Sequence, residues 1–141
     1  MTGCTVHYGS STSWRAVIFD TEFDGGLTEV WGPGTECGVL RVGTGALYWF
    51  GEFVHAEGAL FDDELAAARG RFADWAPWVR ALVEATEPDR LLRHDVDHLG
   101  DGPPGYTVGR VVLVGDAAHA MLPTIGQGRR ARSRTRCASA G

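Results

Sequence analysis

The sequence has no lysine and no long apolar run. Hydrophobic residues make up 44% of its 141 residues, yet no apolar stretch approaches the roughly 20 residues that a membrane-spanning helix needs. This argues against a helix that crosses a membrane. No basic segment followed by an apolar one precedes a cleavage site, so we also expect no secretion signal. Length and composition are those of one ordinary globular domain.

Cysteine is scarce as well. Cys4, Cys37 and Cys137 are odd in number, and their spacing matches neither a zinc site nor a disulfide framework. We therefore expect free thiols and a cytoplasmic protein.

Basic charge comes from arginine alone and is unevenly placed. Residues 1–128 carry 8 arginines against 18 acidic residues, a net charge of −10, whereas residues 129–141 carry five arginines and no acid. These last residues show no apolar periodicity that would predict a packed helix, so we expect a disordered tail. One interpretation of the tail is a basic arm for anionic partners.

Runs of aromatic and β-branched residues predict strands at 28–31, 37–42 and 46–54, the last two joined by a glycine-rich hairpin connection. Three such strands in sequence predict an antiparallel sheet. After these strands the apolar residues recur at helical spacing. Two helices are expected, at 62–74 and 77–85, because Pro77 interrupts the pattern. Asp62-Asp63-Glu64 predicts the start of the first helix. Trp75 and Trp78, at the junction, are expected in the core.

Residues 91–99 predict a further strand with four potential metal ligands, His94, Asp95, Asp97 and His98. In a strand the two histidines share one face and the two aspartates the other, and no further ligand cluster follows. We therefore expect no metal site.

The most informative stretch is 110–128. Val111–Val114 is a continuous apolar run, which predicts a strand buried on both faces. It ends at Gly115-Asp116, and this places a carboxylate at the carboxyl end of the strand, where ligands bind in open α/β sheets. The glycines after Pro123 allow the backbone to approach a ligand closely.

The string Val111 to Gly128 resembles the second FAD-binding motif of the flavoprotein monooxygenase family, the FAD-dependent aromatic-ring hydroxylases with a p-hydroxybenzoate hydroxylase-like fold. The resemblance implies that Asp116 holds the ribityl chain of FAD and that the glycine-rich segment passes beside the isoalloxazine ring. The cofactor-binding residues implied are Gly115, Asp116, Pro123, Gly126, Gln127 and Gly128. His119 belongs to the same string, and we expect a structural role for it.

The resemblance extends more weakly toward the N-terminus. Tyr8-Gly9 and Trp14-Arg15 come close to the family pattern Tyr-x-Gly-x-x-x-Trp-Arg, with one extra residue between the two halves. In the family the antiparallel sheet forms the floor of the substrate pocket. Arg41 and Tyr48 are therefore candidate substrate-binding residues, the alternative being a solvated arginine and a core tyrosine.

The expected fold class is α+β, a partial FAD/NAD(P)-binding fold: an antiparallel substrate-domain sheet with covering helices plus the last FAD-contacting strand. We expect a partial substrate-binding domain at 1–109, the FAD-binding motif at 110–128 and the tail at 129–141.

The family binds the ADP half of FAD with a βαβ unit in which Gly-x-Gly-x-x-Gly opens a helix. Residues 100–105 have these glycines, but Asp101-Gly102-Pro103-Pro104-Gly105 is expected to be a turn, so we expect no such unit within the 141 residues. The neighbours of the Val111–Val114 strand would come from that unit. Without them we expect an exposed, aggregation-prone edge.

The tail also departs from the family, which has a helix after the glycine-rich segment. Synonymous codons for residues 130–141 allow another reading frame to encode a family-like helix, so a frameshift near Gly128 is a second interpretation of the tail. The nucleotide sequence tests it.

The function implied is an FAD-dependent monooxygenase, and we expect the chain to be an incomplete copy. The reaction implied is NAD(P)H-driven hydroxylation of an aromatic or similar small substrate through a flavin hydroperoxide. One alternative is a non-catalytic remnant, or half of a split flavoprotein that needs a partner chain with the dinucleotide-binding half. Another is an FAD-dependent epoxidase or reductase of the same superfamily. We expect a small-molecule substrate, and neither a nucleic acid nor a membrane as partner.

Overall fold

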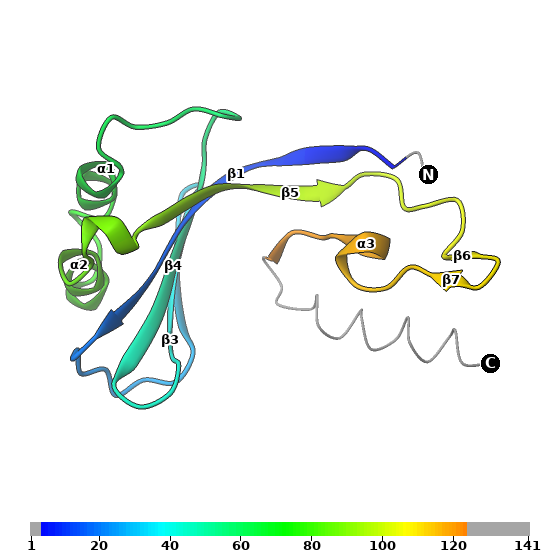
Figure 1. Ribbon diagram of the computed structural model, residues 1–141. Helices are drawn as coiled ribbons and strands as arrows, with labels where there is room; N and C mark the ends of the chain where they lie inside the picture. The colour runs from blue at the N-terminus through cyan, green and yellow to red at the C-terminus, as the bar shows by residue number, and fades with distance from the viewer. Residues whose placement is uncertain (1–3, 124–141) are drawn as a thin grey trace. The chain divides into compact units, whose positions relative to one another are not determined.

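A five-stranded sheet covered on one face by two helices dominates the computed structural model, which describes residues 4–123 (Figure 1). The strand order is β2-β3-β4-β1-β5, and the pairs β2–β3, β3–β4 and β4–β1 are antiparallel. A two-stranded sheet of β6 and β7 follows. The elements are β1 (Val6–Phe19), β2 (Thr28–Gly32), β3 (Thr35–Arg41), β4 (Ala46–Val54), α1 (Glu64–Arg71), α2 (Pro77–Glu84), the 3-10 helix η1 (Pro88–Arg90), β5 (Leu92–Leu99), β6 (Thr107–Val108), β7 (Val111–Val112) and α3 (Asp116–His119).

The chain forms two compact units. One is Ser10–Asp95, and the described residues of the other are 4–9 and 96–123. The division falls inside β1 and β5, at places where the sequence shows no linker. It differs from the division by function expected at residue 109, which stays a prediction. The tail expected at 129–141 lies outside the described residues.

The sequence predicted the middle of the sheet well. The predicted strands at 28–31, 37–42, 46–54 and 91–99 correspond to β2, β3, β4 and β5, and the antiparallel pairing is confirmed. The early start of β1 at Val6 was not predicted. Residues 6–13 are rich in glycine, serine and threonine, which favour loops when read locally. From Ser11 onward, pairing with β4 overrides that preference.

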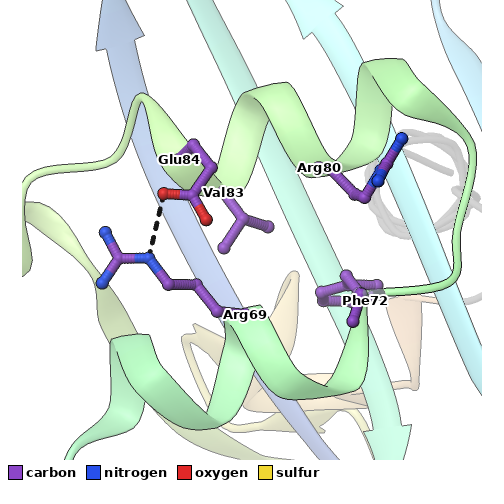
Figure 2. Close-up of a pocket in the computed structure, with 6 residues that line it drawn as sticks. Arg69, Phe72, Arg80, Val83 and Glu84 are labelled. Carbon is purple, nitrogen blue, oxygen red and sulfur yellow. Dashed lines mark hydrogen bonds and ion pairs between the residues drawn. The ribbon is translucent and has the colours of Figure 1, made fainter.

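Both predicted helices are confirmed, with shorter bounds. Asp63 is the N-cap of α1, and its Oδ1 accepts a hydrogen bond of 2.9 Å from the backbone N–H of Ala66. Pro77 is the first residue of α2, where its missing N–H costs nothing. Arg69 Nε and Glu84 Oε2, 3.1 Å apart, join the two helices at their exposed side (Figure 2).

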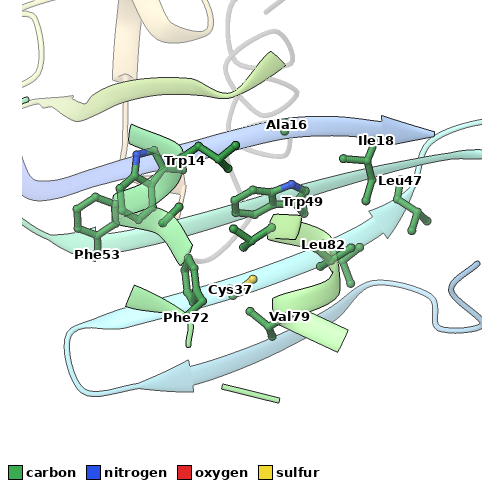
Figure 3. Close-up of a cluster of buried hydrophobic side chains, with 14 residues drawn as sticks. Trp14, Ala16, Ile18, Cys37, Leu47, Trp49, Phe53, Phe72, Val79 and Leu82 are labelled. Atoms are coloured by element: carbon green, nitrogen blue, oxygen red, sulfur yellow. The ribbon is translucent and has the colours of Figure 1, made fainter. Parts of the chain in front are cut away.

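The core of the larger unit lies between the sheet and these helices (Figure 3). Trp14 from β1, Trp49 and Phe53 from β4, and Phe72 after α1 are at most 1% exposed. Trp75 and Trp78 pack against this core as predicted. The indole Nε1 of Trp14 donates to Glu64 Oε2 over 2.7 Å, so even the most buried rings keep their polar atoms paired.

The Val111–Val114 strand differs from the prediction. Only Val111 and Val112 form β7, and they are 64% and 39% exposed, so burial on both faces was wrong. Among the described residues, β7 pairs only with β6. A short strand with one such neighbour has nothing to cover its apolar faces. Both valines of β7 are therefore exposed, and the aggregation expected of such an edge stays a prediction.

Candidate functional site

The predicted ligand-binding turn at Gly115-Asp116 has a backbone that requires glycine. Gly115 is buried, with φ 63° and ψ −140°, a region that side chains with a Cβ rarely adopt. Its carbonyl accepts hydrogen bonds from the N–H groups of Ala118 and His119, at 2.9 and 3.0 Å. This closes the short helix α3 and leaves Asp116 at its first position, exposed to solvent.

The segment after α3 is held against the ends of β1 and β5. The N–H of Leu99 donates to the carbonyl of Ala120 over 2.9 Å. The Leu122 side chain lies directly against Gly9, where a Cβ would also come within 2.8 Å of the Val96 carbonyl oxygen. Gly9 is therefore needed for this close approach. It directly follows Tyr8 in the approximate match to the family pattern noted in the sequence, although no packing role was predicted for it.

The residues at this turn fit a cofactor with a polyhydroxyl chain. Within residues 4–123 no hydrogen bond or ion pair engages the exposed carboxylate of Asp116, so it can accept hydrogen bonds from hydroxyl groups. Gly115 places no side chain in the way. Pro123 is exposed nearby in the sequence, whereas Gly126, Gln127 and Gly128 lie outside the described residues.

The larger unit has a second candidate surface, the face of the sheet opposite the helices, which we call the open face. Alternate residues of each strand point to it. A pocket of about 520 Å³ lies on this face, lined by Arg15, Ala16, Val17, Phe19, Tyr48, Arg90 and Leu92. The Arg90 guanidinium carbon is 5.0 Å from the centre of the Phe19 ring. An aromatic and aliphatic lining with a few polar groups suits a small planar ligand.

The two candidate substrate-binding residues are not brought together. Tyr48 is half-buried and lines the pocket. Arg41 is exposed, and its Nη2 donates to the Phe23 carbonyl over 2.6 Å. Arg41 pairs with Leu47, a residue of the core on the helix side, so it does not share the face of Tyr48. A role in substrate binding stays a prediction for both residues.

Arg15, like Arg90, is a pocket arginine that the sequence did not assign to the substrate. It lies one position from the buried Trp14, and alternation in the strand sends it to the open face. Its Nε donates to Ser13 Oγ over 3.2 Å. The Trp14-Arg15 dipeptide of the family pattern was the signal that could have identified it.

Acidic residues gather on the open face beside this pocket, and sequence reasoning missed them. Glu36 on β3 lies directly opposite Glu52 on β4. Burial, followed by the charges of Glu52 and Glu29, raises the pKa of the Glu36 carboxyl from 4.5 to about 7. Glu52 Oε1 accepts a hydrogen bond of 2.7 Å from Ser11 Oγ. These residues are distant in sequence, so only the strand register reveals the cluster.

A smaller hollow of about 240 Å³ lies between α1 and α2 (Figure 2). Its lining holds none of the predicted site residues: Arg69, Phe72, Ala73, Arg80, Val83 and Glu84. Residues 4–123 contain no group of three or more histidine, cysteine or acidic side chains that could hold a metal ion. Cys4 and Cys37 are free thiols. In the same part of the chain, no helix is long and apolar enough to cross a membrane.

Comparisons with known proteins relate this chain to flavoproteins. The FAD binding domain family matches residues 104–129, which include Gly115 and Asp116. Aurachin C monooxygenase/isomerase of Stigmatella aurantiaca is 36% identical over 129 residues, which cover 86% of this chain and 32% of that protein. FAD-dependent urate hydroxylase of Klebsiella pneumoniae is 33% identical over 132 residues, with 86% and 33% covered.

A solved structure agrees as well. Klebsiella pneumoniae HpxO complexed with FAD and uric acid superposes with a TM-score of 0.82 at 28% identity, covering 92% of this chain and 34% of that one. The antiparallel sheet with its few helices is therefore part of a flavoprotein fold. The chain belongs to the family of FAD-dependent aromatic-ring hydroxylases, the flavoprotein monooxygenases. It spans about a third of the length of the curated relatives that it matches.

Proposed function

We propose that this chain supplies the second flavin-binding segment and the substrate-facing sheet of an FAD-dependent monooxygenase, which hydroxylates a small aromatic molecule with NAD(P)H as reductant. The observation that carries the proposal is the Gly115-Asp116 turn. A buried glycine in a conformation reserved for glycine presents an exposed carboxylate, within a segment that matches an FAD binding domain.

FAD, when bound and reduced, supplies the oxygen chemistry, and the protein supplies position and electrostatics. Asp116 would accept hydrogen bonds from the ribityl hydroxyls and so fix the cofactor along its chain. The pocket on the open face would hold the substrate ring. Val17, Phe19 and Leu92 would exclude water from it, while the Arg15 guanidinium and the Tyr48 hydroxyl would orient polar substituents.

A second candidate is one half of a split flavoprotein, in which a partner chain brings the dinucleotide-binding unit. One observation favours it: Val111 and Val112 of β7 are 64% and 39% exposed. Under this proposal the isolated chain is colourless after purification. It becomes flavin-bound when it is mixed with a polypeptide that carries the Gly-x-Gly-x-x-Gly unit of a relative.

Retention of FAD tests both candidates. The chain is purified alone and with that second polypeptide, FAD is added, and the visible absorbance of bound flavin is measured after gel filtration. We expect Asp116→Ala to abolish retention wherever the wild-type chain shows it. Asp101→Ala is the matched control, because Asp101 is an exposed aspartate of the same unit. Failure of the wild-type chain to retain FAD in either preparation would contradict a flavin-dependent function.

A further inference from the structure

The acidic residues of the open face form a patch together with two aromatic rings. We define the acidic patch as Glu29, Trp31, Glu36, Phe50 and Glu52. In register, Glu36 lies between Trp31 on β2 and Glu52 on β4. Two positions further along β3, Gly38 lies between Glu29 and Phe50 in the same way. Because alternate residues share a face, all five side chains belong to one surface.

Glu36 is the unusual member of the acidic patch. It is 8% exposed, and among the described residues no hydrogen bond or ion pair reaches its carboxylate. The charges that act on it, from Glu29 and Glu52, are both negative. Burial of most of this side chain beside two like charges makes its ionised form costly, while the carboxylate oxygens themselves still reach solvent. A ligand that donates hydrogen bonds to Glu36 would remove that cost, whereas an anionic ligand would increase it.

The aromatic rings add a preference for planar and positively charged groups. The Phe50 ring lies across the backbone of Gly38, since a Cβ there would collide with the ring, and Glu29 Cγ would lie 3.1 Å from that same Cβ. Trp31 is 60% exposed, so its ring is free to contact a ligand. Ring faces beside carboxylates attract cations, and carboxylates accept paired hydrogen bonds from planar N–H groups.

We propose that the acidic patch is a substrate-recognition subsite that selects aromatic molecules carrying a hydrogen-bond-donating nitrogen group. Glu36 accepts hydrogen bonds from that group, and Phe50 and Trp31 contact its plane. The same charges exclude molecules whose corresponding substituent is a carboxylate. That the ligand is a substrate rests on the proposed function; that the patch binds a nitrogen group does not.

Three probes with one ring and different charges test the subsite: benzamidine is a cation that donates N–H groups, benzamide is neutral and donates, and benzoate is an anion. Their affinities for the full chain are measured by titration calorimetry near pH 8, where the Glu36 carboxyl is ionised. Glu36→Gln removes the charge and keeps the shape. Glu22→Gln, an exposed glutamate outside the patch, is the matched control.

We expect Glu36→Gln to lower the affinity for benzamidine by at least about tenfold, because the variant loses a charged hydrogen bond. Glu36→Gln should lower the affinity for benzamide by a smaller factor, and it should leave the affinity for benzoate unchanged or raise it. Glu22→Gln should change none of the three affinities. A benzamidine affinity that Glu36→Gln does not lower, absence of binding included, overturns the proposal. If Glu36→Gln lowers the affinity for benzoate as much as that for benzamidine, the proposal is overturned as well.

The result is separable from the flavin experiment, because Asp116 and Glu36 lie in different compact units. Retention of FAD without Glu36-dependent benzamidine binding would overturn the subsite and leave the proposed function standing. Glu36-dependent binding without FAD retention would keep the nitrogen-binding patch and contradict its role in a flavin-dependent hydroxylase.

Discussion

Thr12 Oγ1 donates a hydrogen bond of 2.8 Å to Asp95 Oδ1, a residue 83 positions away in the sequence, and so joins β1 to β5. Asp95 also accepts from the N–H of Gly58, at 2.9 Å, and pairs with Arg93 at 2.8 Å. One carboxylate thereby connects both strands to the loop after β4. No pattern in the sequence marks these residues as partners.

Loss of the Asp95 carboxylate should destabilise the larger unit. Asp95→Asn leaves the Arg93 guanidinium, 12% exposed, without its ionic partner. We expect a fall of roughly 2–3 kcal/mol in the free energy of unfolding. Urea denaturation followed by tryptophan fluorescence measures it. Asp97→Asn is the control, since Asp97 is exposed, and an equal effect of both changes would contradict the role given to Asp95.

Asp95 should also make the fold sensitive to acid. Burial alone would raise its pKa, but hydrogen bonds from Gly58 and Thr12 and the charge of Arg93 bring the net pKa below the ordinary 3.8. A lowered folded pKa contributes stability above pH 3.8 that is lost as pH falls through the folded value. Melting temperatures between pH 5 and pH 2 should therefore fall more steeply for the wild type than for Asp95→Asn. Parallel curves would refute this.

Glu36 should have the opposite effect on the pH dependence of stability from Asp95. Its folded pKa, about 7, lies above the unfolded value of 4.5. The corresponding stability is complete below pH 4.5 and is lost as pH rises to about 7. We expect Glu36→Gln to become progressively more stable than the wild type as pH rises from 5 to 8. Denaturant midpoints at the two pH values measure the gain, and a constant difference between the proteins would contradict it.

The Trp49 indole depends on Thr86. Trp49 is fully buried, and its Nε1 donates over 2.9 Å to Thr86 Oγ1, which in turn donates to the Leu82 carbonyl at 2.8 Å. Thr86→Val keeps the shape but leaves the indole N–H unsatisfied. The expected cost is about 1–3 kcal/mol in unfolding free energy. Thr44→Val, at an exposed hairpin position, should change stability little, and a similar cost there would argue against this role of Thr86.

The exposed valines of β7 should limit solubility. Unpaired, apolar edges promote association, and charged side chains prevent it. Val111→Lys places a charge where the side chain is 64% exposed, so the fold should tolerate it. We expect a larger soluble fraction on expression and less high-mass material in gel filtration than for the wild type. A wild-type chain that is already monodisperse would contradict the prediction.

Much of the fold could be predicted because many of its elements depend on residues that are close together in the sequence. The hairpin of β3 and β4 follows from a glycine-rich connection between aromatic runs, and α2 follows from Pro77. The left-handed backbone of Ser10, with φ 64°, could not be predicted, since serine rarely adopts that conformation. The burial expected for Val111 failed for a different reason: a strand is buried only where other elements cover it.

The candidate site also has a part that the sequence predicts and a part that depends on the tertiary structure. The sequence by itself determined the family, through Gly115-Asp116 and the string around them. This was possible because the glycine that the turn requires and the carboxylate that it presents are neighbours in the sequence. Only the tertiary structure decided which side chains share the open face. Strand register separated Arg41 from Tyr48 and brought Glu36 opposite Glu52, because side chains alternate between faces and a shift of one position reverses them.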